Sequence, residues 1–153
     1  MSNLRSYAYP GAGEFARDTM HYSQAIRVGD NIFISGQGGW DRSTIEIRPE
    51  LTDEVDQAFD NVDHALKHAG GKGWQQVYRV ITYSTDTRAT HDRIIDNFRR
   101  WMPHHQPTWT EIGVRELGLD TMHIEIEVQA YDVEGAKEAE KGKGEGGVNG
   151  VVG

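Results

Sequence analysis

Cysteine is missing from this chain, since none of its 153 residues carries a thiol. This absence excludes disulfides, thiol catalysis, zinc fingers and iron–sulfur clusters. The chain also lacks a run of about eighteen apolar residues, so no transmembrane helix is expected. The first ten residues show no basic stretch followed by an apolar one, which predicts a cytoplasmic protein without a signal peptide.

Positive charge is in short supply. The 16 lysines and arginines face 24 aspartates and glutamates, which gives a formal net charge of -8. A protein that binds nucleic acid through its phosphates needs a basic face, so a nucleic-acid partner is disfavoured. Hydrophobic residues make up 37% of the chain, which is enough to build the core of one domain.

The last twenty residues differ from the rest. Residues 134–153 are rich in glycine, glutamate and lysine and contain no aromatic residue. Such a segment cannot bury enough apolar surface to offset the entropy lost on ordering. The sequence therefore predicts one domain over residues 1–133 and a disordered tail over 134–153.

Hydrophobic periodicity predicts two helices, at residues 51–69 and 90–101. Gly70 and Gly71 end the first helix, and Pro103 ends the second. The apolar face of the first consists of Leu51, Val55, Ala58, Phe59, Val62, Leu66 and Ala69. Its polar face carries Asp53, Glu54, Asp56, Asp60, Asp63 and Lys67.

Strands are expected at residues 4–9, 25–28, 31–35, 77–84, 108–114 and 123–130. Gly29 and Asp30 read as the turn of a hairpin between the second and third of these. In the last strand, Ile124 and its apolar neighbours alternate with Glu125, Glu127 and Gln129, so the two sets lie on opposite faces.

This order of elements indicates an α+β, two-layer fold with a mixed sheet of about six strands and two helices on one face. The second face of the sheet is then left uncovered. Another subunit is the usual cover for such a face when it is apolar.

Five segments resemble the Rid family of reactive enamine/imine deaminases, also called YjgF-like or L-PSP endoribonuclease-like proteins. They are residues 22–37 (YSQAIRVGDNIFISGQ), 68–71 (HAGG), 80–83 (VITY), 107–110 (PTWT) and 124–130 (IEIEVQA). They follow one another in the family's order from about Tyr22 to Asp132. The chain is similar to the family over most of its length.

The resemblance implies a chorismate-mutase-like fold and a homotrimer with clefts at the subunit interfaces. It also implies hydrolysis of a small reactive imine or enamine to a carbonyl compound and ammonia, without a metal or an organic cofactor. These properties are expectations carried by the family.

Trp109 is the main departure from the family pattern, because the deaminating members place a carboxylate-binding arginine two residues after the proline. An arginine grips a carboxylate with a planar fork, whereas an indole offers one N–H and an apolar face. The resemblance therefore implies a substrate without a carboxylate, bound by Trp109 and the adjacent Thr110. Packing of Trp109 at an interface is the alternative, and Arg115 or Arg79 could supply a cation from elsewhere.

Glu125 matches the family's acid that orients water and moves protons, a role that suits a carboxyl group whose pKa is raised by burial. The alternative is a solvent-facing glutamate on an amphipathic strand, which is the reading favoured for Glu127. Tyr22 matches a tyrosine that lines the cleft from the neighbouring subunit, although a core aromatic residue is equally compatible with the pattern.

Five further residues are candidates for substrate binding. Gly36 and Gln37 lie where the family presents backbone groups to its ligand, and Trp40 follows in the next loop. Asp92 replaces a frequent asparagine, or merely begins a helix. Glu111 shares a strand face with Trp109 and is a candidate second carboxylate near Glu125.

His64 and His68 lie four residues apart on a helix, but no third metal ligand is suggested, so a metal site is not expected. Three alternatives to imine hydrolysis stay open at this stage. They are a biosynthetic hydrolysis, isomerisation or cyclisation of a substrate without nitrogen, a non-catalytic ligand-binding trimer, and the ribonuclease activity named for some relatives.

Overall fold

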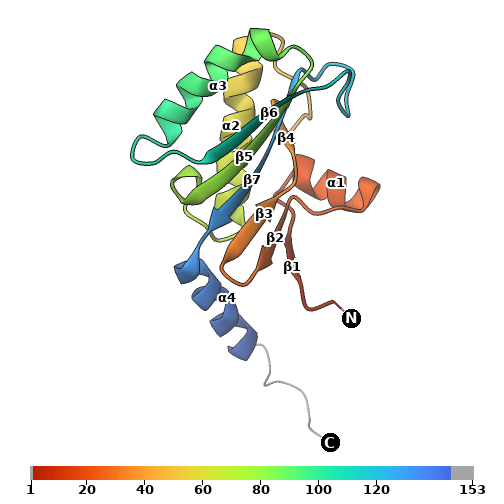
Figure 1. Ribbon diagram of the computed structural model, residues 1–153. Helices are drawn as coiled ribbons and strands as arrows, with labels where there is room; N and C mark the ends of the chain where they lie inside the picture. Colours follow the sequence, from red (N-terminus) through yellow and green to blue (C-terminus); the bar gives the residue numbers. More distant parts are fainter. Residues whose placement is uncertain (1, 146–153) are drawn as a thin grey trace, which may run out of the picture.

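A single mixed β-sheet forms the centre of the computed structural model, which describes residues 2–145. Along the sheet the strand order is β1-β2-β3-β7-β5-β6, and β4 pairs with β7 beside this path (Figure 1). The strands are β1 (Arg5–Tyr7), β2 (Ala25–Val28), β3 (Asn31–Ile34), β4 (Gln37–Gly38), β5 (Val77–Ser84), β6 (Thr108–Gly113) and β7 (Ile124–Tyr131). Only β5 and β6 run parallel, as expected for strands joined through a helix.

Four α-helices and one 3-10 turn complete the described part of the chain. They are α1 (Ala12–Met20), α2 (Leu51–His68), η1 (Trp74–Gln76), α3 (Thr87–Trp101) and α4 (Val133–Glu145). The helices α2 and α3 lie side by side on one face of the sheet (Figure 1). The predicted α+β class and the two covering helices are confirmed, whereas α1, α4 and the short β4 were not predicted.

Local sequence signals fix the ends of these elements. Gly29 adopts the left-handed conformation in the β2–β3 turn. At the end of α2 the N–H of Gly70 donates to the carbonyl of Lys67, and that of Gly71 donates to Leu66. This is a Schellman cap, and the positive φ of Gly70 permits it. The helix α3 begins three residues before its predicted start, because the Asp86 side chain caps it.

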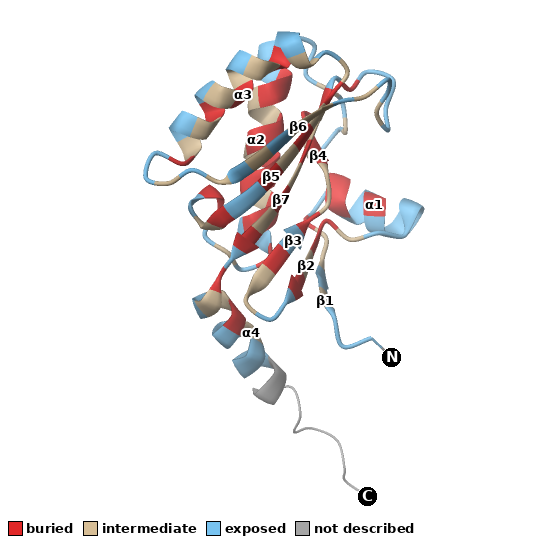
Figure 2. Cartoon of the chain, in the orientation of Figure 1, coloured by how far each residue is buried: buried red, intermediate tan, exposed pale blue. Residues whose placement is uncertain are grey.

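The core lies between the sheet and α2. The inward side chains of β7 (Ile124, Ile126, Val128 and Ala130) pack there with Val55, Phe59, Val62 and Leu66 of α2. The outward side chains of β7, Glu125, Glu127 and Gln129, are half-buried on the open face (Figure 2). The alternation predicted for the last strand is therefore confirmed.

The predicted disorder from Glu134 onwards is wrong as far as Glu145, where the structure has α4. The Asp132 carboxylate accepts the N–H of Gly135 at 3.1 Å and so caps the first turn. Alanine, lysine and glutamate are strong helix formers, and Lys141 pairs with Glu138 at 2.8 Å. Composition concealed this local propensity. Residues 146–153 lie outside the described part.

Two buried acids join distant elements. The Asp132 side chain, 1% exposed, pairs with Arg27 at 2.8 Å, and Arg27 also donates to the Ala69 carbonyl at the end of α2. Glu54 lies on the predicted polar face of α2, yet it is 1% exposed. It accepts hydrogen bonds from the backbone N–H groups of His123 at 2.6 Å and of Ile124 at 3.3 Å. A position on the polar face of α2 therefore does not leave Glu54 in solvent, because a tertiary contact satisfies the carboxylate.

Candidate active site

Glu125 lies near the start of β7 on the open face of the sheet. It is opposite Gly38 on β4 and Tyr83 on β5. The Glu125 carboxylate rests against the backbone of Gly36, so closely that a side chain at Gly36 would overlap it. Gly36 therefore makes room for the Glu125 carboxylate.

Two effects raise the pKa of Glu125 above its ordinary value. Burial is the larger, because it disfavours the charged form, and the negative charge of Glu127 adds to it. The neighbouring carboxylate is thus Glu127, which shares the open face of β7. A carboxyl group with a raised pKa is a stronger base once it is ionised, and this suits it to proton transfer at neutral pH.

Glu127 is held by a tyrosine. The Tyr83 hydroxyl donates to the Glu127 Oε1 atom at 2.5 Å, which raises the pKa of Tyr83 to about 12. The proton therefore stays on Tyr83 at neutral pH, and Glu127 remains an acceptor. This pair places a fixed negative charge next to Glu125 on the same strand.

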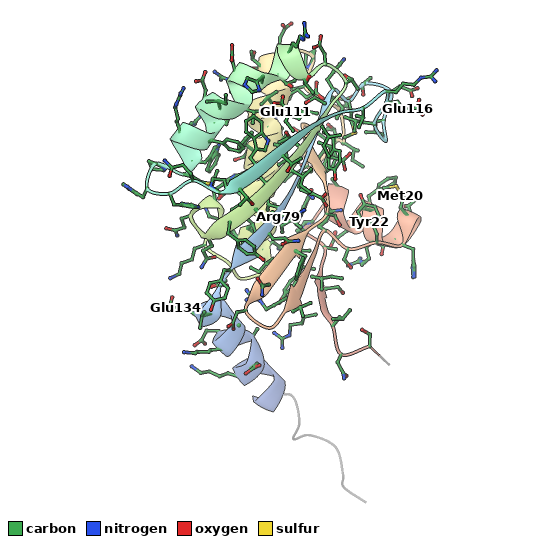
Figure 3. The ribbon with its side chains drawn as sticks, viewed as in Figure 1. Met20, Tyr22, Arg79, Glu111, Glu116 and Glu134 are labelled. Atoms are coloured by element: carbon green, nitrogen blue, oxygen red, sulfur yellow. The ribbon has the colours of Figure 1, made fainter. Side chains whose placement is uncertain are left out.

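A cavity of about 190 Å³ opens beside Glu125. Its wall is mostly apolar and comes from α1, from the segment after β4 and from the loop that precedes β7. The lining residues are Ala12, Phe15, Ala16, Met20, Tyr22, Gln24, Trp40, Ile45, Gly118, Leu119, Met122 and Glu125. Figure 3 shows Met20 and Tyr22 beside α1. Three predicted residues, Glu125, Tyr22 and Trp40, therefore line one cavity of a single protomer. The resemblance implied that Tyr22 comes from the neighbouring subunit, whereas here it lies in the same protomer as Glu125.

A buried chain of hydrogen bonds supports this cavity. The Trp40 indole donates to the Tyr9 hydroxyl at 3.2 Å, and Tyr9 donates to Gln37 at 2.7 Å. Gln37 in turn donates to Gln24 at 2.7 Å. The Gln37 side chain is therefore fully engaged in the interior, and its predicted contact with a ligand would have to come from its backbone. Such satisfied networks hold a wall rigid.

Glu54 of α2 holds the start of β7, the strand that carries Glu125, from the opposite face of the sheet. Its carboxylate binds the backbone at His123 and Ile124 and also contacts the His123 Nδ1 atom at 2.8 Å. The start of β7, and with it Glu125, is thereby tied to α2. Glu54 is a positioning residue in this arrangement.

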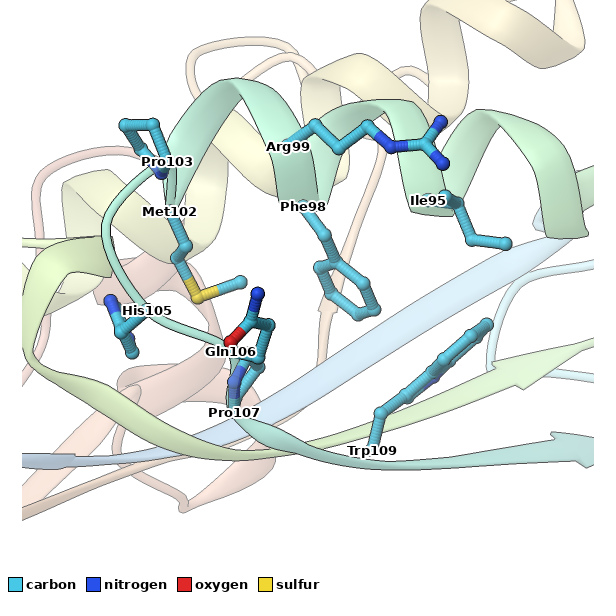
Figure 4. Close-up of a pocket in the computed structure, with 9 residues that line it drawn as sticks. All are labelled: Ile95, Phe98, Arg99, Met102, Pro103, His105, Gln106, Pro107 and Trp109. Atoms are coloured by element: carbon cyan, nitrogen blue, oxygen red, sulfur yellow. The ribbon is translucent and has the colours of Figure 1, made fainter.

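Trp109 lies on the opposite side of the sheet from Glu125. Its indole donates to the Thr82 hydroxyl at 3.0 Å, and its ring contacts His91 and Phe98, with centroids 5.5 and 5.0 Å apart. Figure 4 shows the ring beneath α3, facing Phe98. There it lines a second cavity of about 440 Å³, formed mainly by the end of α3 and the loop before β6. Trp109 and Glu125 can share a cleft only if different protomers supply them.

Glu111 shares its strand face with Trp109, as predicted, and contacts the His91 Nδ1 atom at 2.6 Å. Because this face points towards α3, the prediction that Glu111 is the second carboxylate near Glu125 is wrong within a protomer. Figure 3 shows Glu111 beside α3, apart from Tyr22. The Glu111 Oε1 atom is buried without a hydrogen-bond partner among the described residues.

The other candidates are dispersed. Thr110 is exposed on the open side of β6, in the row of Ile81 and Glu127. Asp92 is exposed on α3 and lines neither cavity. Neither Arg115 nor Arg79 lines the cavity beside Glu125.

Within residues 2–145, no three histidine, aspartate or glutamate side chains gather as a metal site would require. His64 and His68 instead lie with ring centroids 6.5 Å apart, and the Tyr9 ring packs edge-on against both. Burial lowers the pKa of His64, so its neutral form is favoured. None of the described helices is both long and apolar enough to cross a membrane.

Sequence reasoning missed most of the cavity wall. The helix α1 carries Ala12, Phe15, Ala16 and Met20, whose spacing of three and four residues is helical. That spacing could have revealed the helix. Nothing in the sequence indicates that Leu119 and Met122 fold back onto it, because the loop before β7 has no periodic pattern.

Comparisons with known proteins agree with this architecture. A family model described as endoribonuclease L-PSP matches residues 16–132. The RutC family protein YjgH of Escherichia coli (strain K12) is 33% identical over 124 residues, covering 80% of this chain and 92% of the relative. A 2-iminobutanoate/2-iminopropanoate deaminase of Dermatophagoides farinae is 30% identical over 109 residues, covering 69% of this chain and 81% of that protein.

A solved structure of protein YJGH has a TM-score of 0.72 and 28% sequence identity, covering 84% of this chain and 95% of the other. The family model spans β2 to β7 together with α2 and α3. The chain therefore belongs to the endoribonuclease L-PSP family, which comprises the Rid and YjgF-like proteins that its hairpin and last strand resemble.

Proposed function

We propose that this protein is a hydrolase of small reactive imines or enamines and that Glu125 activates the attacking water. The observation that carries the proposal is a half-buried carboxyl group of raised pKa at the wall of a cavity. Membership of a family with a relative named as an imine deaminase supports the reaction type.

The reaction converts an imine and water into a carbonyl compound and ammonia. Ionised Glu125 takes a proton from water as the oxygen bonds to the imine carbon. It then returns that proton to the nitrogen, which gives a carbinolamine. The carboxylate next moves the hydroxyl proton of the carbinolamine to the nitrogen, so that the carbon–oxygen double bond forms as the carbon–nitrogen bond breaks and ammonia leaves. The Tyr22 hydroxyl lines the same cavity and is the candidate donor to the substrate or to water.

We further propose a homotrimer in which Trp109 of one protomer approaches the Glu125 cavity of the next. The open face of the sheet supports assembly, since Phe33, Val28 and Tyr131 are 38–55% exposed there. In this arrangement Trp109 supplies an indole where an arginine would bind a carboxylate. Sedimentation equilibrium should give three times the mass of one chain, and a monomer would contradict the assembly.

The test of the reaction compares Glu125→Gln with the unmodified protein. We expect turnover of an imine generated in situ to fall by about 10²- to 10⁴-fold, the usual contribution of a general base. Ammonia release measures it. Glu134→Gln is the matched control, because Glu134 is exposed on α4, far from the cavity (Figure 3). Unchanged turnover in Glu125→Gln would show that Glu125 is not the base.

A fall in the turnover of Glu125→Gln would not be explained by unfolding of the variant. Because the folded protein raises the pKa of Glu125, ionising it at neutral pH opposes folding. This destabilisation is absent at low pH and grows as the pH rises through the unfolded and then the folded pKa. Glu125→Gln should therefore unfold at the same temperature as the unmodified protein or higher at neutral pH.

An RNA substrate is disfavoured by the electrostatics. The chain has a net charge of -8, and the cavity places an acid where a phosphate would have to approach. Retained ligand binding without any turnover by the unmodified protein would instead favour a non-catalytic binding protein.

A further inference from the structure

Apolar side chains gather at the mouth of the Glu125 cavity although they remain accessible to water. Phe15 is 47% exposed, Met20 54%, Leu119 41% and Tyr22 39%. Single exposed apolar residues are ordinary on a protein surface, but a group around one cavity marks a binding site. These four residues come from α1, the segment that follows it and the loop before β7, so the tertiary fold assembles the group.

The size of the cavity limits what it can hold. Its volume is about 190 Å³. An apolar cavity of about 150 Å³ binds benzene, so this one accommodates a single aromatic ring or a branched aliphatic group of similar size. The deeper wall is lined by the Trp40 ring and the Met122 side chain, both of which are buried.

The charge of the cavity is one-sided. Glu125 is the one ionisable carboxyl group in its wall, and none of the described lining residues is a lysine, arginine or histidine. A ligand carboxylate bound here would lie near Glu125 without a compensating cation from the same protomer. A neutral imine meets no such repulsion, and a protonated iminium is attracted by ionised Glu125.

We infer that this cavity selects uncharged or cationic imines bearing an aromatic or branched aliphatic group and rejects imines bearing a carboxylate. This inference rests on the proposed hydrolase function for the reaction, but not for the binding preference. In this inference the residues of α1 and of the loop before β7 determine the substrate class, whatever the position of Trp109.

A matched pair of ligands tests the binding preference without any chemistry. Acetophenone and phenylglyoxylate share a phenyl ketone and differ in a methyl group against a carboxylate. Titration calorimetry should show acetophenone binding at least about tenfold more tightly, which corresponds to about 1.4 kcal/mol. Equal or tighter binding of phenylglyoxylate would overturn the inference.

The corresponding imines test turnover. The imine of acetophenone should be hydrolysed with a kcat/KM at least about tenfold higher than that of the phenylglyoxylate imine, by the same conversion. If neither imine is hydrolysed but acetophenone binds selectively, the hydrolase proposal fails and the binding preference stands. If both are hydrolysed and the carboxylated imine is faster, the reaction stands and the binding preference fails.

Leu119→Arg sharpens the test, because it adds a cation at the mouth of the cavity. Leu119 is 41% exposed in a loop, so the protein should fold normally. We expect phenylglyoxylate binding to strengthen and the preference for acetophenone to shrink or reverse. Leu4→Arg is the control, since Leu4 is 56% exposed and does not line this cavity. The same gain in Leu4→Arg would attribute the effect to net charge and overturn the inference.

Discussion

The two faces of the sheet differ in the partners that their acidic side chains have. On the face towards α2 and α3, acids find partners within the chain, as Asp132 does with Arg27 and Glu111 with His91. On the open face, Glu127 is held by the Tyr83 hydroxyl, and burial and Glu127 raise the pKa of Glu125. The paired acids stabilise the fold, whereas an acid without a cationic partner keeps a shifted pKa that suits it to proton transfer.

The comparison also separates the two residues that the sequence singled out together. Trp109 has its N–H satisfied and its ring packed against Phe98 and His91, so its contacts within the protomer are structural. Glu125 instead lines a cavity. The helix-covered face should therefore dominate stability, and the open face should dominate activity.

The largest expected effect is on stability, and it comes from breaking the buried ion pair of Asp132 and Arg27. Asp132→Asn leaves Arg27 buried without its counter-charge, so the free energy of unfolding should fall by about 3–5 kcal/mol at pH 7. Urea unfolding followed by circular dichroism measures this. The exposed pair of Arg17 and Asp18 gives the control, because Asp18→Asn should change stability by less than about 1 kcal/mol.

The pH dependence of this difference has a definite sign. Although burial alone would raise the pKa of Asp132, hydrogen bonds from Arg27, Gly135 and Gln76 hold it below its ordinary value. The stabilisation is present at neutral pH and is lost as the pH falls through the folded pKa. The two proteins should converge in acid, and a constant difference would contradict the ion-pair explanation.

The next effect concerns Trp109. Removing its half-buried ring in Trp109→Ala should lower the free energy of unfolding by about 2–3 kcal/mol, somewhat less than for a fully buried tryptophan. Chemical denaturation measures it, and Thr108→Ala on the exposed side of β6 is the control. A stability loss near zero would show that the ring contributes little to packing and would shift its role towards the proposed intersubunit cleft.

The smallest expected effect is a shift in the pH dependence of activity, and it concerns Glu127 on the open face of the sheet. Glu127→Gln removes the negative charge that helps to raise the pKa of Glu125, so the acid limb of the kcat/KM profile should move to lower pH. Imine hydrolysis measured across the pH range reports this shift, with Glu134→Gln as the unshifted control. A limb that stays in place would mean that Glu127 does not influence the base, and a limb that moves to higher pH would contradict the sign of the effect.

Much of the fold could be predicted from the sequence because its signals are local. Alternation along residues 124–130 predicted both faces of β7, and the Gly70–Gly71 pair predicted the end of α2. Failures occurred where composition outweighed local propensity, as in α4, or where a helix was short and rich in small residues, as in α1.

The candidate site was harder to predict from the sequence than the fold, because its residues meet only through tertiary contacts. The sequence pointed to Glu125, Tyr22 and Trp40, and the structure places all three around one cavity. It could not show that Leu119 and Phe15 complete that cavity, or that Glu127 and not Glu111 is the carboxylate beside Glu125.

By itself the sequence determined the alternation of faces, the helix ends and the family, since each depends on residues close together in the chain. Only the tertiary structure decided which face each functional group shares and which charges are compensated. Strand order and burial bring distant residues together, and no local pattern encodes those distances.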